Sequence, residues 1–251
     1  MKQMNKKKKS QNSFINIYGI NPVKEALSKG NAKAIYITEN FIKNKRISEI
    51  INAAENKNIP FNIIDLNTFK KQFGFNNGQT IAAQVNLDFN SNIEDIINTD
   101  PAKNSNILIV DKVQDPRNLG ALIRSAESAG FDGIIISSNN AAKINSTVVE
   151  SSSGAISHIQ IINDQNINQI IKKLKDNNYW IIGLDMDGDK EYEEYDFYGN
   201  IALVIGSEGS GISKLTKSLC DQIYKISMKG KTESLNVSVA AGIMMFKISN
   251  S

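Results

Sequence analysis

The chain has little of the chemistry that disulfides and metal clusters need, with one cysteine, Cys220, and one histidine, His158, among its 251 residues. A single cysteine excludes a disulfide framework within the chain and a cysteine-based metal cluster. His158 has no thiol or paired carboxylates beside it, so we expect a structural role. The run Asp185-Met-Asp-Gly-Asp189 is a poor calcium loop, because its glycine stands fourth instead of sixth and the closing glutamate is absent. We therefore expect no metal.

Long apolar runs are also missing. None approaches the roughly 18 residues that cross a bilayer, and the lysine-rich start lacks the apolar core of a signal peptide. We expect a cytoplasmic protein with no membrane contact. The chain is long enough for two domains with proper cores.

Positive charge is concentrated at the start of the chain. Lys2 and Lys6 to Lys9 are five of the 29 basic residues, and no acidic residue occurs among residues 1–13. The rest carries 24 basic against 26 acidic residues, so it is not a general nucleic-acid binder, and any RNA recognition must be local and depend on shape. We expect residues 1–13 to be disordered. They either add salt-dependent phosphate affinity or serve as a solubilising tail.

Short apolar runs alternate with helical stretches in the second half of the chain, which predicts a parallel α/β sheet. The expected strands are 107–110, 134–137, 180–184, 201–205 and 223–226. Ahead of them, residues 14–88 read as a separate small α/β unit, and the Asn/Ser/Asp-rich stretch 89–104 reads as a linker. The small unit is expected to contain a turn and helix over 17–27, strands at 35–38, 61–65 and 80–85, and a helix over 46–57.

A glycine-rich loop follows the apolar run Ile201-Ala-Leu-Val-Ile205, with glycines at 206, 209 and 211. Ligands of parallel sheets bind at the carboxyl ends of strands, and glycines permit close backbone approach. The spacing matches neither the dinucleotide fingerprint nor a P-loop. Glu208 would repel a pyrophosphate, so a neutral or cationic ligand fits better. The alternative is a plain glycine turn between a strand and a helix.

A polar cluster of Glu233, Ser234 and Asn236 runs directly into the small apolar stretch Val237 to Ala241. The polar residues stand where a helix would begin, and the small ones let a backbone approach a ligand or another segment. A capped and tightly packed helix is the alternative to a binding site.

The third informative segment follows the expected strand 107–110. Asp115-Pro116 is a good helix start, and Gly130 is a suitable stop. Asn118 lies in the first turn of this helix and Arg124 nearly two turns later. An ordinary ion pair between Arg124 and Glu127 is the alternative to a functional arginine.

Taken in their order along the chain, the three segments closely resemble the motifs of the SpoU (TrmH-type) family of RNA ribose 2′-O-methyltransferases. Ser227 is a departure, since family members usually have proline there. The matching residues of the first motif are Asp115, Asn118, Gly120 and Arg124; of the second, Gly206, Glu208, Gly209, Gly211 and Ile212; and of the third, Ile226, Met228, Gly230 and 234–240.

The resemblance implies an α/β domain over 105–251, with a mostly parallel sheet and a deep trefoil knot, preceded by a small α/β RNA-binding domain similar to certain ribosomal proteins. It also implies a homodimer formed through the knotted domain, with the active site near the subunit interface.

The resemblance further implies S-adenosylmethionine as the cofactor, with its adenosine on the backbone of the loops 206–211, 226–230 and 234–236. The cofactor contacts expected are Gly206, Ile226, Met228 and Leu235. Arg124 is expected to activate the ribose 2′-hydroxyl, with Asn118, Glu208, Ser234 and Asn236 shaping the site. Because an arginine with a pKa above about 12 is a poor base, we expect Arg124 to orient the ribose and stabilise developing negative charge.

The small first domain favours a single nucleotide of the large-subunit (23S) ribosomal RNA as the target. We expect that nucleotide to be a guanosine. Two alternatives stay open. One is a transfer-RNA guanosine 2′-O-methyltransferase, and the other is an inactive RNA-binding ribosome-assembly factor.

Overall fold

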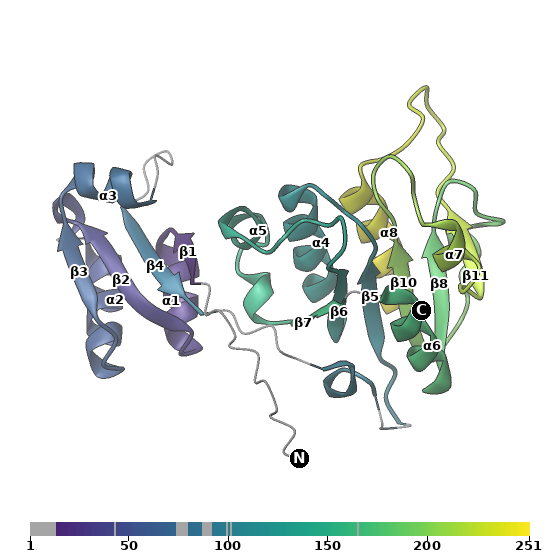
Figure 1. Cartoon of the computed structure of the whole chain (residues 1–251), viewed down its shortest axis with the longest axis horizontal. Coiled ribbons are helices and arrows are strands. Elements are labelled where there is room, and N and C mark those ends of the chain that lie inside the picture. Colours follow the sequence, from purple (N-terminus) through teal and green to yellow (C-terminus); the bar gives the residue numbers. More distant parts are fainter. Residues whose placement is uncertain are drawn as a thin grey trace, which may run out of the picture. The chain divides into compact units, whose positions relative to one another are not determined.

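The computed structural model describes residues 14–42, 44–73, 80–86, 92–98, 100, 102–164 and 166–251. The lysine-rich arm over residues 1–13 lies outside them. The chain divides into two compact units, Met1–Leu87 and Asp88–Ser251 (Figure 1). In the described part of the chain, no helix is both long and apolar enough to cross a membrane.

The first unit is a four-stranded sheet in the order β1-β4-β2-β3, with β2 and β3 parallel and the other pairs antiparallel. The two predicted helices and the three predicted strands are present, within a few residues of the expected bounds. One further strand, β1, occupies a segment expected to be a turn, because Ile17 turns inward and is buried. The elements are β1 (Ile15–Tyr18), α1 (Ile20–Ser28), β2 (Ala32–Thr38), α2 (Lys45–Asn56), β3 (Phe61–Ile64), α3 (Leu66–Phe73) and β4 (Ile81–Val85).

Both faces of this small sheet carry apolar side chains. Alternation along β2 places Ile35 and Ile37 on one face and Tyr36 on the other. Helices α1 and α2 contact one another, and α1 contacts β1, β2 and β4. On the Tyr36 side, Phe69 and Phe73 of α3 pack with Tyr36. The unit therefore has a core of its own.

The second unit contains a seven-stranded sheet in the order β7-β6-β5-β10-β8-β11-β9, and all its strand pairs are parallel. All five predicted strands are present, so the predicted parallel sheet is confirmed. The two strands that were not predicted lie at the sheet edges. The strands are β5 (Asn106–Val110), β6 (Gly133–Ser137), β7 (Gln160–Asp164), β8 (Tyr179–Leu184), β9 (Lys190–Glu191), β10 (Asn200–Ile205) and β11 (Gln222–Lys225).

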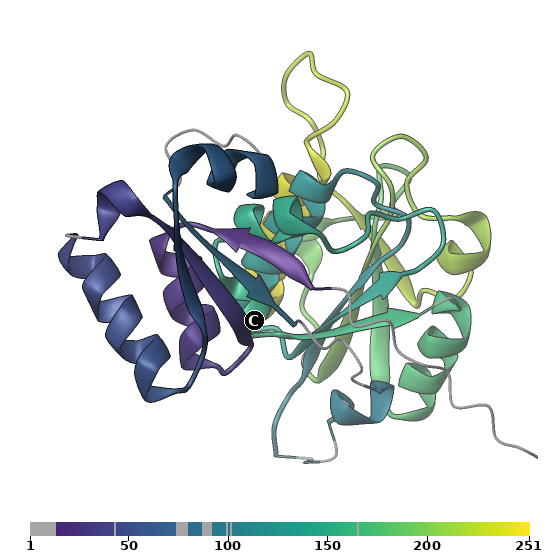
Figure 2. The same ribbon diagram turned by 60° about the vertical axis from the view of Figure 1, so that its left-hand side comes forward.

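Helices cover the sheet on both faces (Figures 1 and 2). Helix α6 packs with Ile107, Ile109 and Ile181 in one cluster, whereas α4 contacts α5 and α8. The chain returns after β11 through residues 226–236 to α8, so the C-terminal helix lies against α4. The helices are α4 (Pro116–Ser128), α5 (Ser146–Ser151), α6 (Ile167–Asp176), α7 (Lys214–Lys217) and α8 (Val237–Ser249).

Part of the segment expected to be a linker, 89–104, packs on the second unit. Residues Ile93–Asp95 form a 3₁₀ turn, and Ile96 is buried in the cluster of α6. The backbone N–H of Asn98 donates to the Tyr179 hydroxyl at 2.9 Å. The polar composition of this stretch suggested a linker. It also contains three isoleucines, 93, 96 and 97, and these pack on the core of the second unit.

The start of α4 is as predicted. The Asp115 side chain accepts the N–H of Arg117 at 2.7 Å, and Pro116 occupies the first turn. Gly130, with φ +73°, follows the end of the helix. The sequence signals at both ends of α4 are thus confirmed.

Two glycines on the packed helices α4 and α8 should respond to alanine in opposite ways. A Cβ at Gly120 would lie 2.7 Å from the Ser151 side chain, whereas the nearest atom to a Cβ at Gly242 is the Ser125 hydroxyl at 3.7 Å. We predict that Gly120→Ala lowers the free energy of unfolding by about 1–3 kcal/mol through overpacking. Gly242→Ala should raise it by about 0.5–1 kcal/mol, because alanine favours the helix. Urea unfolding measures both, and equal effects would contradict the packing described.

Candidate functional site

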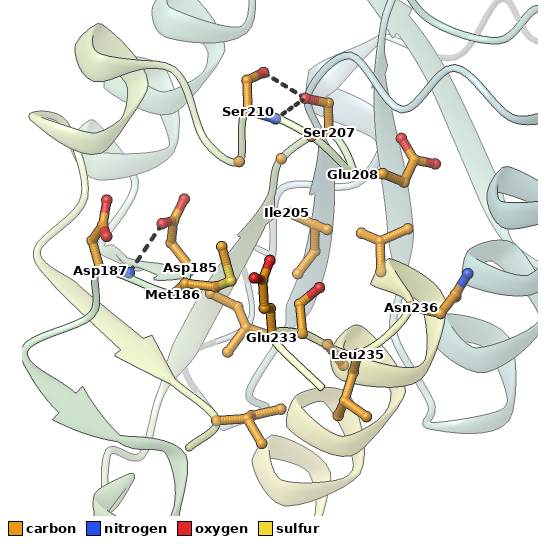
Figure 3. Close-up of a pocket in the computed structure, with 18 of the residues that line it drawn as sticks. Asp185, Met186, Asp187, Ile205, Ser207, Glu208, Ser210, Glu233, Leu235 and Asn236 are labelled. Atoms are coloured by element: carbon orange, nitrogen blue, oxygen red, sulfur yellow. Dashed lines mark hydrogen bonds between the residues drawn. The ribbon is translucent and has the colours of Figure 1, made fainter. Parts of the chain in front are cut away.

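A cavity of about 540 Å³ lies at the carboxyl ends of β8 and β10, within the roughly 300–1,000 Å³ typical of small-molecule sites. Its wall comes from three loops, which gather at one edge of the sheet (Figure 3). Open α/β sheets bind their ligands at this edge. The lining residues are 184–187 after β8, 205–211 after β10, Lys217, Ile226 and Met228 after β11, and 233–237 with Ala240 at the start of α8.

The loop after β10 closes on itself. Ser207 and Gly211 exchange two backbone hydrogen bonds, of 3.2 and 3.0 Å. A Cβ at Gly206 would overlap the backbone of Gly211, and Gly211 itself has φ +62°. Nothing lies within 4 Å of a Cβ placed on Gly209. Close approach and positive φ therefore explain two of the three glycines, as the sequence predicted.

A hydrogen-bonded chain joins the three sequence motifs. The Asn118 side chain, from the first turn of α4, donates to Glu208 Oε1 at 2.8 Å. Its oxygen accepts from Asn236 Nδ2 at 3.0 Å. Asn236 in turn caps α8, since its Oδ1 accepts the N–H of Ser238 at 2.9 Å. Segments more than 80 residues apart in the sequence thus meet at one edge of the cavity.

The structure brings most of the predicted site residues together. The four predicted cofactor contacts all line the cavity, and so do Glu208, Ser234 and Asn236. Asn118 adjoins them through its hydrogen bonds. The four predicted contacts are Gly206, Ile226, Met228 and Leu235.

Arg124 is the exception, because it does not line the cavity. Its Nη1 donates to the Ser153 hydroxyl at 3.2 Å. Ser153 has φ +52°, a left-handed conformation that side chains other than glycine rarely adopt. The alternative ion pair with Glu127 is not among those formed by the described residues. Sequence reasoning missed Ser153, whose only signal is its place in the turn that follows α5.

Four carboxylates line the cavity, those of Asp185, Asp187, Glu208 and Glu233, against one lysine, Lys217. Figure 3 shows Asp185 and Asp187 on the side opposite Glu208. Lys217 Nζ lies 2.7 Å from Asp185 and 3.1 Å from Asp187, which leaves Glu208 and Glu233 without a cation from this wall. The excess of negative charge favours a cationic ligand, as Glu208 suggested.

Asp185 and Lys217 hold each other in the charged form. Burial alone would raise the pKa of Asp185, but hydrogen bonds from Lys217 and from the N–H groups of Ile212 and Asp187 outweigh it and hold the pKa below its usual 3.8. Burial likewise lowers the pKa of Lys217, and its bonds to the two aspartates raise it above its usual value. The sequence did not predict either residue for the site.

Ser227 stands where the family resemblance leads us to expect proline. Its N–H and its hydroxyl donate to the Glu191 carboxylate at 3.2 and 2.6 Å. A proline has no N–H to donate. Glu191 therefore holds the backbone between the two lining residues Ile226 and Met228.

Residues 105–246 match the family model described as the SpoU rRNA Methylase family. The chain belongs to this family. Residues 16–88 match a second model, described as RNA 2′-O ribose methyltransferase substrate binding. The family predicted from the three motifs is confirmed.

A relative from Staphylococcus saprophyticus, described as a TrmH family tRNA/rRNA methyltransferase, is 42% identical over 144 residues. The alignment covers 57% of this chain and 58% of the relative. The chain thus spans little more than half the length of the curated relatives it matches.

Solved structures share the fold. The SpoU methyltransferase AviRb from Streptomyces viridochromogenes, in complex with AdoMet, has a TM-score of 0.82 at 20% identity and covers 98% of this chain and 93% of its own. An AdoMet-bound rRNA methyltransferase from Sinorhizobium meliloti has a TM-score of 0.80 at 21% identity, with coverages of 94% and 87%. The A. aeolicus TrmH/SpoU tRNA modifying enzyme, at 24% identity and a TM-score of 0.54, covers 63% of this chain and 79% of its own. The predicted fold class, an α/β domain with a mostly parallel sheet that follows a small α/β domain in the chain, is confirmed. The trefoil knot stays a prediction.

The two roles of Asn236 can be separated by substitution. Aspartate caps helices as well as asparagine does, so Asn236→Asp should change the free energy of unfolding by less than about 0.5 kcal/mol, whereas Asn236→Ala should lower it by about 1 kcal/mol. Both variants lose the donor to Asn118. We predict that both reduce methyl transfer by about tenfold or more, since the bonds continue to the charged Glu208. Thermal unfolding and a methylation assay measure the two effects. Full activity in Asn236→Asp would show that the bond to Asn118 is dispensable.

Proposed function

We propose that this protein is an S-adenosylmethionine-dependent RNA ribose 2′-O-methyltransferase that acts in the cytoplasm. The observation that carries the proposal is the cavity at the strand ends, beside which Asn118, Glu208 and Asn236 of the three motifs are joined by hydrogen bonds. An RNA-binding protein without activity would not need this arrangement.

The residues of the cavity fit the proposed cofactor. When bound, S-adenosylmethionine would supply a methyl group on a positively charged sulfur. The apolar side chains of Ile226, Met228 and Leu235 would hold the adenosine, and Gly206 would let it approach the backbone. The carboxylates of Glu208 and Glu233, which lack a cationic partner among the residues that line the cavity, suit the positive charge.

Arg124 would orient the ribose and its adjacent phosphate and stabilise the charge that develops on the 2′-oxygen. Asn118, Glu208, Ser234 and Asn236 would shape the surface that receives the nucleotide. Because Arg124 does not line the cavity of one chain, we infer that a second copy completes the site.

Helix α8 supports a homodimer. Its side chains Val239 and Phe246 are 50% and 46% exposed although both are apolar, while α4 covers another side of the helix. Apolar side chains exposed on one helix are typical of a protein interface. A second copy of the chain is the occupant that the family resemblance favours.

The large-subunit ribosomal RNA is the proposed target, with one guanosine methylated. The rRNA methyltransferase from Sinorhizobium meliloti matches this chain over both units, whereas the tRNA modifying enzyme matches 63% of it. Residues 14–87 carry nine basic against five acidic residues, and residues 88–251 carry 15 against 21. The positive first unit would therefore supply most of the affinity for phosphate. Transfer RNA is the second candidate target.

The test is methyl transfer from labelled S-adenosylmethionine to unmodified large-subunit RNA, small-subunit RNA and transfer RNA, followed by mapping of 2′-O-methylated positions. We expect label at one ribose of the large-subunit RNA, lost in Arg124→Ala.

Arg124→Lys should also lose about 10²-fold in kcat, because lysine lacks the planar fork of donors. Full activity in Arg124→Lys would refute the orienting role.

Label on transfer RNA alone would show that transfer RNA, and not the large-subunit RNA, is the target. If no RNA is labelled and the cofactor does not bind, the assembly-factor alternative is correct.

The homodimer has its own test. We predict that Phe246→Glu converts the protein to a monomer in analytical ultracentrifugation, because a charge would be buried in the interface. Leu215→Glu is the matched control, since Leu215 is also exposed and apolar but belongs to a different helix, α7. A monomeric wild type, or equal effects of the two variants, would contradict the proposed interface.

A further inference from the structure

Asp185, the first residue after β8, has a carboxylate that is 7% exposed and lies directly against the glycine loop. Its Oδ2 accepts the N–H of Ile212 at 2.9 Å, at the point where the loop ends. A Cβ at Gly211 would overlap the same carboxylate. The third glycine of the loop thus leaves room for Asp185.

Lys217 completes the arrangement from α7. Its Nζ donates to Asp185 Oδ1 at 2.7 Å. It also donates to Asp187, whose side chain is 86% exposed, at 3.1 Å. The backbone N–H of Asp185 donates to the carbonyl of Tyr224 on β11 at 2.9 Å. Asp185 therefore connects three elements: its carboxylate joins the glycine loop to α7, and its backbone N–H joins β11.

We propose that Asp185 and Lys217 are positioning residues that hold the Ser207–Gly211 loop in its ligand-binding conformation before the ligand arrives. The proposal rests on the proposed function only for the identity of that ligand. A loop with glycines at 209 and 211, directly after Gly206, has little conformational preference of its own. Without the pair, ligand binding would have to order the loop and would lose that much affinity.

The chain contains a matched control for this pair. Lys175 Nζ lies 2.6 Å from Asp221 Oδ1, and Asp221 Oδ2 accepts the N–H of Ile181 at 2.8 Å. The chemistry resembles that at Asp185, with one carboxylate that pairs with a lysine and accepts a backbone N–H, although Asp185 accepts a second N–H, from Asp187. Neither Asp221 nor Lys175 lines the cavity.

The experiment compares Asp185→Asn, Lys217→Met, their combination and Asp221→Asn in the full chain. Binding of S-adenosylmethionine without RNA is measured by calorimetry, and hydrogen exchange of the amides 207–212 is measured without ligand. We expect Asp185→Asn and Lys217→Met each to raise the Kd about tenfold, as for loss of a charge-assisted hydrogen bond. The Kd of the double variant should be no higher than that of the weaker-binding single variant, because the two residues act as one unit. Asp221→Asn should change the Kd less than about twofold, although it should lower the Tm by about as much as Asp185→Asn does.

Three results would overturn the proposal: an unchanged Kd in Asp185→Asn, an equal loss in Asp221→Asn, or additive losses in the double variant. If the wild type does not bind S-adenosylmethionine, the proposed function fails, and hydrogen exchange decides the positioning role alone. Faster exchange at Gly211 and Ile212 in Asp185→Asn than in Asp221→Asn would then support it, and equal exchange would refute it.

Discussion

The close approach of Gly206 and Gly211 is the constraint on which the site depends. Because no side chain separates them, the chain reverses within five residues after β10 and Ile212 returns to the core. The reversal leaves Glu208 beside Asn118 and brings the Ile212 N–H onto Asp185. Without it, the wall after β10 would lie apart from the walls after β8 and β11.

Local sequence signals predicted the elements well where one segment carried the whole signal. Asp115 and Pro116 marked the start of α4, Asn236 capped α8 as its position suggested, and the apolar runs became parallel strands. The strands β7 and β9 were missed, because β9 has two residues and β7 has only two adjacent isoleucines between polar residues. The burial of Ile96 was missed because most of the residues around it in the sequence are polar.

Contacts between distant segments could not be predicted from the sequence in this way. Nothing in the run Asp185 to Asp189 indicates that its first residue accepts an N–H from residue 212 and pairs with Lys217. The contact between Arg124 and Ser153 likewise depends on how α5 packs on α4. The family resemblance predicted which residues gather around the cavity. It did not predict which side chains form hydrogen bonds with one another.

Because Asn236 caps the start of α8, fraying of that helix has a chemical consequence. The first turn of a helix has few internal hydrogen bonds and opens more readily than the strands of a buried sheet. Each opening would withdraw Asn236 from Asn118 and leave the Glu208 side of the cavity incomplete. Heating would therefore abolish the site through one helical turn before the sheet unfolds. A ligand bound in the cavity would slow amide exchange at the start of α8 without changing the slow exchange of β5 and β10.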